Sequence, residues 1–292
     1  MPAWFTGELF GTFLLVFFGC GSVAAATLLG AQVGIFQVAI VWGLGIALAI
    51  HLTGALSGAH LNPAVTCALA ACGLFPARLI GGYVAAQFCG AFLAAAALHA
   101  VYAGALLAYE AAHGIVRGAA GSEATAMVFG EFFPNPGGQP LTAAHRALIG
   151  TGGAFFCEAL GTAVLVLAVL GTTDEKNSDR PRGFAPAMIG LTVTALISLL
   201  APLTQAAFNP ARDLAPRIWS ALAGWGAVPF TANGWGWLTV YVLAPLVGGQ
   251  VAALAYRIFL RPAYSKGQGT EIPPAKYQLP TTNYQPSTID DQ

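Results

Sequence analysis

Long runs of apolar residues, broken by short polar segments, dominate the hydrophobic pattern of this chain. Asp, Glu, Lys and Arg are absent from four long stretches, which are 9–77, 79–109, 183–211 and 218–256. A helix that crosses a membrane needs about 20 mainly apolar residues, so these stretches are long enough for several spans. The pattern predicts six membrane-spanning helices, over residues 4–26, 34–55, 79–101, 152–172, 184–203 and 235–259.

Two apolar segments, 62–72 and 209–217, are too short to cross a membrane. Eleven helical residues rise about 16 Å, which is roughly half of a bilayer's hydrocarbon core. Each segment opens with Asn-Pro-Ala, in which Asn is a favoured helix N-cap and Pro is favoured at the first helical position. The sequence therefore predicts two half-helices, which begin at Asn62-Pro63-Ala64 and at Asn209-Pro210-Ala211.

The two halves of the chain repeat one another. GELFGTFLLV at 7–16 resembles CEALGTAVLV at 157–166, and HLNPAV at 60–65 resembles AFNPAR at 207–212. Each half contains three spans and one half-helix, and because three is odd, the second half enters the membrane from the opposite side. We therefore expect an all-α membrane protein of six transmembrane helices plus two re-entrant half-helices in an inverted repeat, with the half-helices meeting tip to tip near the midplane. Inverted repeats are typical of transport proteins.

This pattern divides the chain into four parts. They are a first repeat at 1–101, a long Gly-rich extracellular loop at 102–150, a second repeat at 151–260 and a disordered cytoplasmic tail at 261–292. Cytoplasmic loops carry an excess of Lys and Arg. Eight such residues fall on the side of both termini, and Arg117 and Arg146 fall on the other. Both termini are therefore expected in the cytoplasm, and the protein is expected in the cell membrane.

Composition supports a membrane protein over several other classes. Hydrophobic residues make up 57% of the 292 positions and charged residues 8%, against about 25% charged in ordinary soluble domains. Such a chain is not disordered, and its few charges argue against a soluble enzyme. With a net charge of zero it has no basic surface, so no nucleic-acid partner is expected. The five scattered cysteines lack metal-ligand spacing, and neither a metal nor a cofactor is expected.

The backbone that leads into each half-helix is the candidate lining of a pore. It contains Gly58, Ala59, His60 and Leu61 in the first repeat, and Gln205, Ala207 and Phe208 in the second. Non-helical backbone at this depth is tolerated only where protein buries it or where it lines a water-filled cavity. We expect a ladder of carbonyl acceptors here, with N–H donors from Asn62 and Asn209 at the centre. His60 is expected to fix the loop geometry, and pH gating is the alternative.

Charged residues at membrane depth are costly and indicate a structural or functional role. Glu8 and Glu158 occupy equivalent positions in spans one and four, and we expect each to accept hydrogen bonds from the nearby loop. A proton relay is the alternative for these two carboxylates. Arg212 is the third residue of the second half-helix, where the helix dipole also disfavours a cation. A charge kept against both penalties predicts a functional residue, and the alternative is a structural pair with Asp213.

The chain resembles the major intrinsic protein family, the aquaporins, at Ser57-Gly58-Ala59-His60-Leu61-Asn62-Pro63-Ala64-Val65 and at Asn209-Pro210-Ala211-Arg212-Asp213. The resemblance covers about residues 4–260. Asp213, the long third loop and the extended stretch after Arg217 look like the glycerol-facilitator branch, the aquaglyceroporins. The resemblance implies a homotetramer in the lipid bilayer with one pore per subunit. It also implies passive conduction of glycerol, other small neutral solutes and water.

The same resemblance implies a constriction at four positions, which fall here on Trp42, Ile197, Ala206 and Arg212. Trp42 and Arg212 match the glycerol facilitators. Ile197 and Ala206 are more similar to nodulin-type channels, which implies an alternative preference for water, urea, ammonia or neutral metalloid acids.

These features predict a channel that carries out no catalysis. A polyol would place its hydroxyls on the carbonyl ladder and on Arg212, and its CH groups against Trp42, Ile197 and an apolar wall. Ions would be excluded by the cost of dehydration, and protons by the positive ends of the half-helices. A coupled secondary carrier, a membrane enzyme and an adhesive junction protein with vestigial pores are the alternatives. The scarcity of acids in the spans argues against the carrier.

Overall fold

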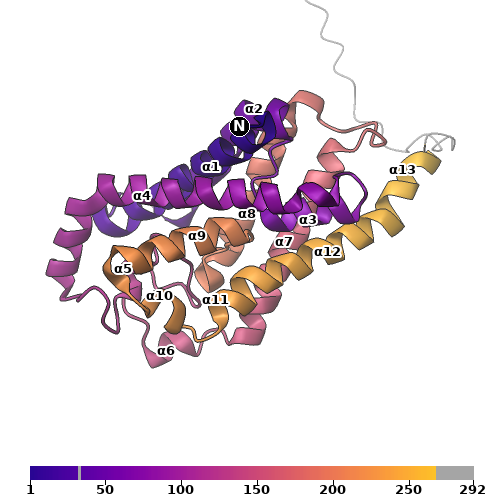
Figure 1. Ribbon diagram of the computed structural model, residues 1–292. Helices are drawn as coiled ribbons and strands as arrows, with labels where there is room; N and C mark the ends of the chain where they lie inside the picture. Colours follow the sequence, from indigo (N-terminus) through magenta and orange to yellow (C-terminus); the bar gives the residue numbers. More distant parts are fainter. Residues whose placement is uncertain (32–33, 268–292) are drawn as a thin grey trace, which may run out of the picture.

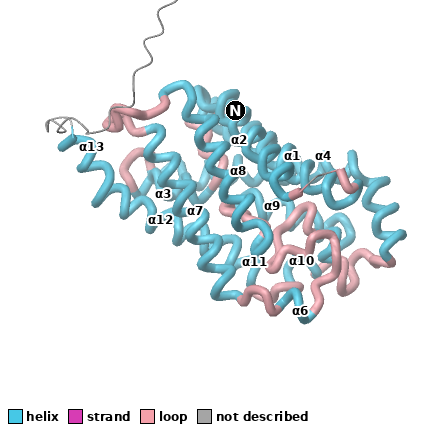
Figure 2. The backbone as a smooth tube through the Cα atoms, turned by 180° about the vertical axis from the view of Figure 1, so that it is seen from behind, coloured by secondary structure: helices cyan, strands magenta, loops and turns pink. Residues whose placement is uncertain are grey.

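The computed structural model describes residues 1–31 and 34–267, which form helices and loops without strands (Figures 1 and 2). The elements of the first half are α1 (Ala3–Leu29), α2 (Ile35–Ser57), α3 (Pro63–Ala71), η1 (Ala77–Leu79) and α4 (Ile80–His113). The connecting loop holds α5 (Glu123–Ala126) and α6 (Ala143–Arg146). The second half contains α7 (Thr151–Thr173), η2 (Arg182–Phe184), α8 (Ala185–Thr204), α9 (Pro210–Ser220), η3 (Ala221–Trp225), α10 (Val228–Thr231), α11 (Gly236–Leu238), η4 (Thr239–Leu243), α12 (Ala244–Ala255), η5 (Tyr256–Leu260) and α13 (Arg261–Gly267).

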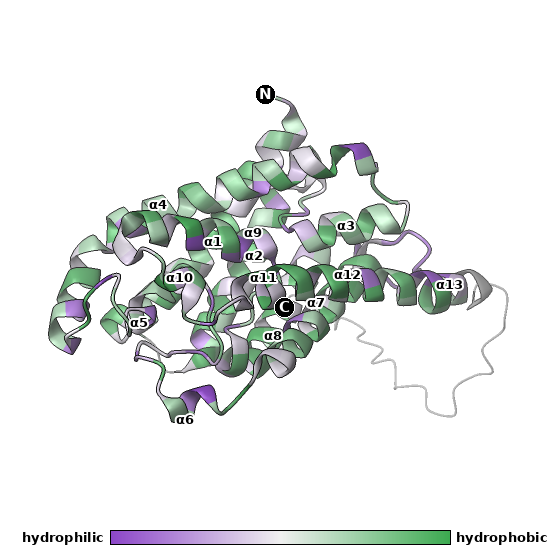
Figure 3. Cartoon of the chain, turned by 60° about the horizontal axis from the view of Figure 1, so that its bottom comes forward, coloured by the Kyte–Doolittle hydropathy of each residue, from purple (hydrophilic) through white to green (hydrophobic). Residues whose placement is uncertain are grey.

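Six helical segments within the described residues are long and apolar enough to cross a membrane, which confirms the predicted number of spans. They are Ala3–Leu29, Ile35–Ser57, Ala77–His113, Thr151–Thr173, Arg182–Thr204 and Gly236–Tyr264. Large apolar side chains lie on their outer faces, for example Leu44, which is 62% exposed, and Leu199, which is 72% exposed. Figure 3 shows hydrophobic colour along these long helices. An apolar exterior of this extent fits contact with lipid.

The third span is longer than the sequence predicted. It was expected to end at residue 101, but α4 continues to His113, so the first part of the predicted loop is helical. Residues 102–113 are rich in Ala and Leu, which are strong helix formers, and bilayer thickness does not oblige a helix to end. The helix ends where Gly114 adopts a left-handed conformation, with a φ of 63°.

The predicted disordered tail is also corrected at its start. Residues Arg261–Gly267 form α13, which continues directly from the last span, so helix persists where disorder was expected from residue 261. The remainder of that predicted tail, residues 268–292, lies outside the described residues.

The two repeats cross at the centre of the molecule, where α2 packs against α8. The crossing is so close that a Cβ added to Gly190 would lie 2.3 Å from the Gly43 carbonyl oxygen, and one added to Gly43 would lie 2.6 Å from the Gly190 carbonyl oxygen. Between the two repeats Trp42-Gly43-Leu44 aligns with Ile189-Gly190-Leu191, so Gly43 and Gly190 are at equivalent positions. A residue that contacts its own equivalent lies on the axis that relates the repeats, so this crossing marks the pseudo-two-fold axis.

Each repeat also contains one close pair of long helices. A Cβ on Gly90 of α4 would lie 2.2 Å from the Leu9 carbonyl oxygen of α1, and a Cβ on Gly248 of α12 would lie 2.0 Å from the Ala159 carbonyl oxygen of α7. Leu9 aligns with Ala159 in the repeats, and Tyr83-Val84 and Gly90 align with Tyr241-Val242 and Gly248, so these two contacts are equivalent. Small residues allow such close approach between helices in lipid.

The half-helices α3 and α9 lie between the longer helices (Figure 1). Helix α9, from the second repeat, packs on α4 of the first, while α3, from the first repeat, packs on α12 of the second. Each repeat therefore packs against the half-helix of the other.

We expect Gly190→Ala to destabilise the protein, because the new methyl group would collide with backbone at the central crossing. Overpacking of this kind costs ~1–3 kcal/mol. Thermal unfolding in detergent should show a lower midpoint than in the wild type. Gly104→Ala is the matched control, since Gly104 lies on α4 with no atom within 4 Å of an added Cβ. Equal midpoints for the two variants would contradict the close crossing.

Candidate pore and constriction

The two half-helices begin with equivalent N-caps. The Asn62 side-chain oxygen accepts a hydrogen bond from the Ala64 N–H at 2.8 Å. The Asn209 side-chain oxygen accepts from the Ala211 and Arg212 N–H groups, at 3.0 and 3.2 Å. In both helices Pro occupies the first turn, where its missing N–H leaves no bond unmade. The sequence predicted these two starts, and the helices begin at the predicted residues.

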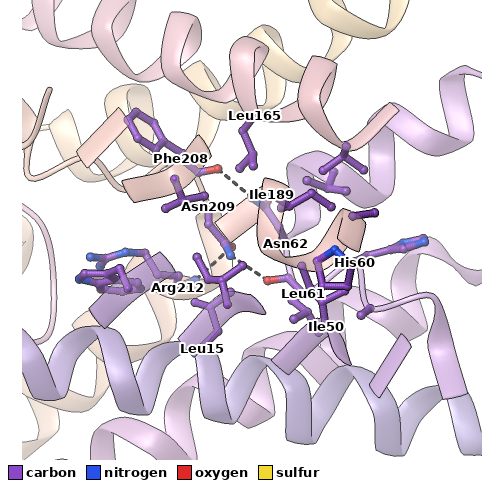
Figure 4. Close-up of a pocket in the computed structure, with 18 of the residues that line it drawn as sticks. Leu15, Ile50, His60, Leu61, Asn62, Leu165, Ile189, Phe208, Asn209 and Arg212 are labelled. Carbon is purple, nitrogen blue, oxygen red and sulfur yellow. Dashed lines mark hydrogen bonds between the residues drawn. The ribbon is translucent and has the colours of Figure 1, made fainter. Parts of the chain in front are cut away.

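The amide groups of the same two Asn residues join the half-helices tip to tip. Asn62 Nδ2 donates to the Phe208 carbonyl at 2.9 Å, and Asn209 Nδ2 donates to the Leu61 carbonyl at 2.8 Å, as the dashed lines in Figure 4 show. An Asn amide carries two N–H donors. One donor of each amide is thus bound, while the second has no hydrogen-bond partner among the described residues.

The backbone before each half-helix alternates into the left-handed region. Positive φ angles of 50° to 60° occur at Ala59, Leu61, Gln205, Ala206 and Phe208. An L-residue in this region costs about 1–3 kcal/mol, so the surrounding structure must fix it. The alternation keeps these carbonyls out of helical hydrogen bonding. The residues of the predicted ladder that line the larger cavity are Gly58, Ala59, His60, Leu61, Ala207 and Phe208.

Two buried carboxylates hold these loops in place. Glu8 accepts hydrogen bonds from the His60 N–H at 2.9 Å and the Leu61 N–H at 2.8 Å. Glu158 accepts from the Ala207 N–H at 3.1 Å and the Phe208 N–H at 2.7 Å. Both side chains are fully buried. The loop N–H groups therefore find partners at a depth where water cannot supply them.

Side chains also donate hydrogen bonds to the same two carboxylates. Glu8 also accepts from Ser57 Oγ and Gln87 Nε2, both at 2.8 Å, and Glu158 accepts from Thr204 Oγ1 at 2.6 Å. Within the described chain no His or Lys side chain bonds to either one. Their contacts are those of side chains that support the two loops.

Two cavities lie along this backbone. The larger, of about 200 Å³, includes Thr173 and Pro186 at one end and the half-helix junction further in. The smaller, of about 150 Å³, is lined by Met127, Glu131, Asn135 and Gln205 among others. Trp42, Ile197 and Arg212 line both cavities. The two cavities therefore adjoin at three of the four residues that were predicted to form a constriction.

All four predicted constriction residues are brought together and buried. The Arg212 guanidinium carbon lies 4.2 Å from the centre of the Trp42 ring, which is cation–π geometry. Gly19 makes room for that ring, since a Cβ there would lie 2.2 Å from it. Apolar side chains make up much of the rest of the larger cavity's lining and include Leu15, Ile50, Leu165 and Ile189 (Figure 4). The lining therefore combines a few polar groups with many apolar side chains.

The ion pair of Arg212 differs from the one considered from sequence. Arg212 pairs with Glu131, whereas Asp213 pairs with Arg217, with 2.7 Å between Arg217 Nη2 and Asp213 Oδ1. A pair between Arg212 and the adjacent Asp213 is therefore wrong. Sequence analysis missed Glu131. Its one signal was a single acid within the apolar run Met127–Phe133 of the long loop.

Among the described residues, no three His, Cys, Asp or Glu side chains gather closely enough to hold a metal ion. Polar groups that line the two cavities include loop backbone, the Asn62 and Asn209 side chains, and the Arg212–Glu131 pair. These groups can form hydrogen bonds with a solute that passes between them.

Six spanning helices and two half-helices that meet beside a lined cavity define the class of inverted-repeat membrane proteins with a half-helix pore. The family model described as major intrinsic protein matches residues 3–256, so the chain belongs to the major intrinsic protein family.

Relatives of similar length support this assignment. The chain is 39% identical over 255 residues to a glycerol uptake facilitator protein of Pseudomonas aeruginosa, which covers 87% of each chain. It is 41% identical over 252 residues to the glycerol uptake facilitator protein of Escherichia coli K12, covering 86% of this chain and 85% of that one. The X-ray structure of the aquaglyceroporin from Plasmodium falciparum matches with a TM-score of 0.77 and 27% identity, covering 90% of this chain and 98% of that one.

We expect Glu158→Gln to destabilise the protein, since an amide would turn an N–H donor towards loop N–H groups that need an acceptor. A buried donor left without its partner costs about 1–3 kcal/mol. The unfolding midpoint in detergent should fall. Glu175→Gln, at an exposed loop position, is the control and should leave the midpoint unchanged. A midpoint for Glu158→Gln equal to that of the control would contradict the supporting role of Glu158.

Proposed function

We propose that this chain forms a passive channel for small neutral solutes, above all glycerol and related polyols, through which water also passes. The observation that carries the proposal is the mixed lining of the cavities. A few polar groups, namely loop backbone, the two Asn side chains and Arg212, lie among apolar side chains. The names of the relatives, which include a propanediol uptake facilitator of Salmonella typhimurium at 35% identity over 254 residues, support the same solute class.

A polyol matches such a lining because its carbon chain carries hydroxyls on one side and CH groups on the other. In this proposal the hydroxyls bond to the carbonyls of Gly58, Ala59, His60 and Leu61, and of Gln205, Ala207 and Phe208. The CH groups face the apolar wall. Hydrogen bonds to the carbonyls then replace those that the hydroxyls lose with water. Without these acceptors, a solute hydroxyl would be buried unpaired, which costs free energy.

The constriction residues Trp42, Ile197, Ala206 and Arg212 are proposed to select among solutes. Arg212 offers N–H donors to a hydroxyl, and the Trp42 ring packs against carbon. Trp42 with Arg212 is the combination expected for a polyol channel. The nodulin-type alternative, drawn from Ile197 and Ala206, is not favoured, because the relatives are named for glycerol and propanediol uptake.

The cavity lining and the two half-helices would also exclude ions and protons. An ion would shed its hydration shell beside an apolar wall, and the carbonyls along one side replace too little of it. The N-termini of α3 and α9 place the positive ends of two helix dipoles at their junction. The free N–H groups of Asn62 and Asn209 would there bind water oxygen, which prevents a continuous donor chain for protons.

The setting of the channel is part of this proposal. We place the protein in the cell membrane with both termini in the cytoplasm and residues 102–150 on the outer side, following the distribution of basic residues. We propose a homotetramer with one pore per subunit, without catalysis or a cofactor.

Stopped-flow light scattering on proteoliposomes tests the function directly. A panel of glycerol, urea and sorbitol should show glycerol entry well above that of empty liposomes and little entry of the larger sorbitol. Glycerol entry no faster than in empty liposomes would contradict the channel. Accumulation driven by counterflow or by a pH gradient would instead indicate a coupled carrier.

In the same assay we expect Ala206→Phe to slow glycerol more than water, because a ring at this position narrows the constriction for a carbon chain. A tenfold loss of glycerol permeability would correspond to about 1.4 kcal/mol of added barrier. Ala100→Phe, at an exposed position of α4, is the control and should leave both rates unchanged. An unchanged ratio of glycerol to water permeability in Ala206→Phe would count against a constriction at this position.

A further inference from the structure

Glu131 lies in the loop between α5 and α6, yet its side chain is only 2% exposed. Its backbone is fixed to the second half-helix, because its N–H donates to Asp213 Oδ1 at 2.7 Å and its carbonyl accepts a hydrogen bond from Arg217. Its Oε1 forms an ion pair with Arg212 whose geometry is not that of a directed hydrogen bond. The loop thus brings a carboxylate to the arginine of the constriction.

Four buried charges form one neutral cluster at this point. Arg212 pairs with Glu131, and Arg217 pairs with Asp213. In the part of the chain that the structure describes, none of the four forms an ion pair outside this cluster. Charges so deeply buried are tolerated when they are paired. The carboxylate of Glu131 is therefore expected to be ionised and to accept hydrogen bonds.

The second oxygen of that carboxylate is unoccupied. Glu131 Oε2 is buried and has no hydrogen-bond partner among the described residues. Neighbouring amides direct their N–H donors elsewhere, since Gln205 Nε2 donates to the Met127 carbonyl at 3.2 Å and Asn135 Nδ2 donates to the Ala201 carbonyl at 3.0 Å. Glu131 lines the smaller cavity together with Arg212. Buried acceptors are normally hydrogen-bonded, and a molecule in the cavity can supply the missing donor.

We propose that Glu131 is a specificity-determining residue of the pore, whose Oε2 accepts a hydrogen bond from a solute hydroxyl while Arg212 donates to the neighbouring hydroxyl. This inference rests on the proposed channel function and deepens it. A donor and an acceptor that stand side by side on the loop side of the constriction match a solute with hydroxyls on adjacent carbons. The favoured solutes are therefore 1,2-diols, glycerol included.

Isomeric propanediols give a direct test, because 1,2- and 1,3-propanediol have the same atoms and nearly the same size. Wild-type proteoliposomes should admit the 1,2-isomer faster than the 1,3-isomer after subtraction of the rates in empty liposomes. In Glu131→Gln an amide NH2 group, which donates hydrogen bonds, replaces the acceptor oxygen Oε2. The ratio of the two permeabilities should then fall towards one, by up to about tenfold, which equals about 1.4 kcal/mol.

Glu123→Gln is the matched control for this test. Glu123 lies in the same loop and is also buried, but its carboxylate oxygens accept from the Gly121 N–H at 2.9 Å and the Leu141 N–H at 3.1 Å. It does not line the two cavities of the pore. This variant should keep the wild-type ratio. Glu131→Asp is a second variant, which keeps the negative charge but draws the carboxylate back by one methylene group. Its ratio of 1,2- to 1,3-propanediol permeability should lie between those of the wild type and Glu131→Gln.

The outcomes distinguish a failure of this inference from a failure of the proposed channel function. Polyol entry in the wild type no faster than in empty liposomes would overturn the channel itself. A conducting wild type with equal rates for the two isomers would overturn the role of Glu131 alone. The same holds if Glu131→Gln and Glu131→Asp both keep the wild-type ratio, or if Glu123→Gln changes it equally.

Discussion

Backbone N–H groups that leave a helix inside a membrane must find acceptors within the protein, and this requirement governs the whole structure. Two loops break helical bonding at membrane depth, one before each half-helix. Glu8 and Glu158 accept hydrogen bonds from their N–H groups. Across the junction, Asn62 donates to the Phe208 carbonyl and Asn209 donates to the Leu61 carbonyl. Without these partners each free group would cost several kcal/mol in lipid, and the half-helices could not start where they do.

In the proposed channel, the arrangement that satisfies the loops also lines the pore. Carbonyls that are excluded from helical bonding would act as acceptors beside the cavity, and one N–H of each Asn amide remains for a solute. The close crossing of α2 and α8 at Gly43 and Gly190 brings the two repeats together, and apolar side chains complete the lining of the cavity. Structural support and solute recognition would then come from the same short stretches of backbone, so that a change in one would alter the other.

Sequence was informative wherever a feature depends on local chemistry. Charge-free runs predicted six spans, Asn-Pro-Ala predicted both helix starts, and the cost of buried charge pointed to Glu8, Glu158 and Arg212. One error came from using the length of a bilayer span to place the end of the third helix. The local composition of residues 102–113, rich in Ala and Leu, already favoured the helix that continues to His113. The other omission depends on tertiary contact: sequence could not pair Glu131 with Arg212, since that contact joins residues far apart through the fold of a long loop.

Crystals of the protein soaked in glycerol would test the central claim most directly. We expect diffraction to show glycerol in the passage beside Asn62 and Asn209 and between Trp42 and Arg212, with hydroxyls towards the loop carbonyls and carbons towards Leu15 and Ile189. Side chains that close the space between the two cavities, with glycerol absent from both, would contradict it.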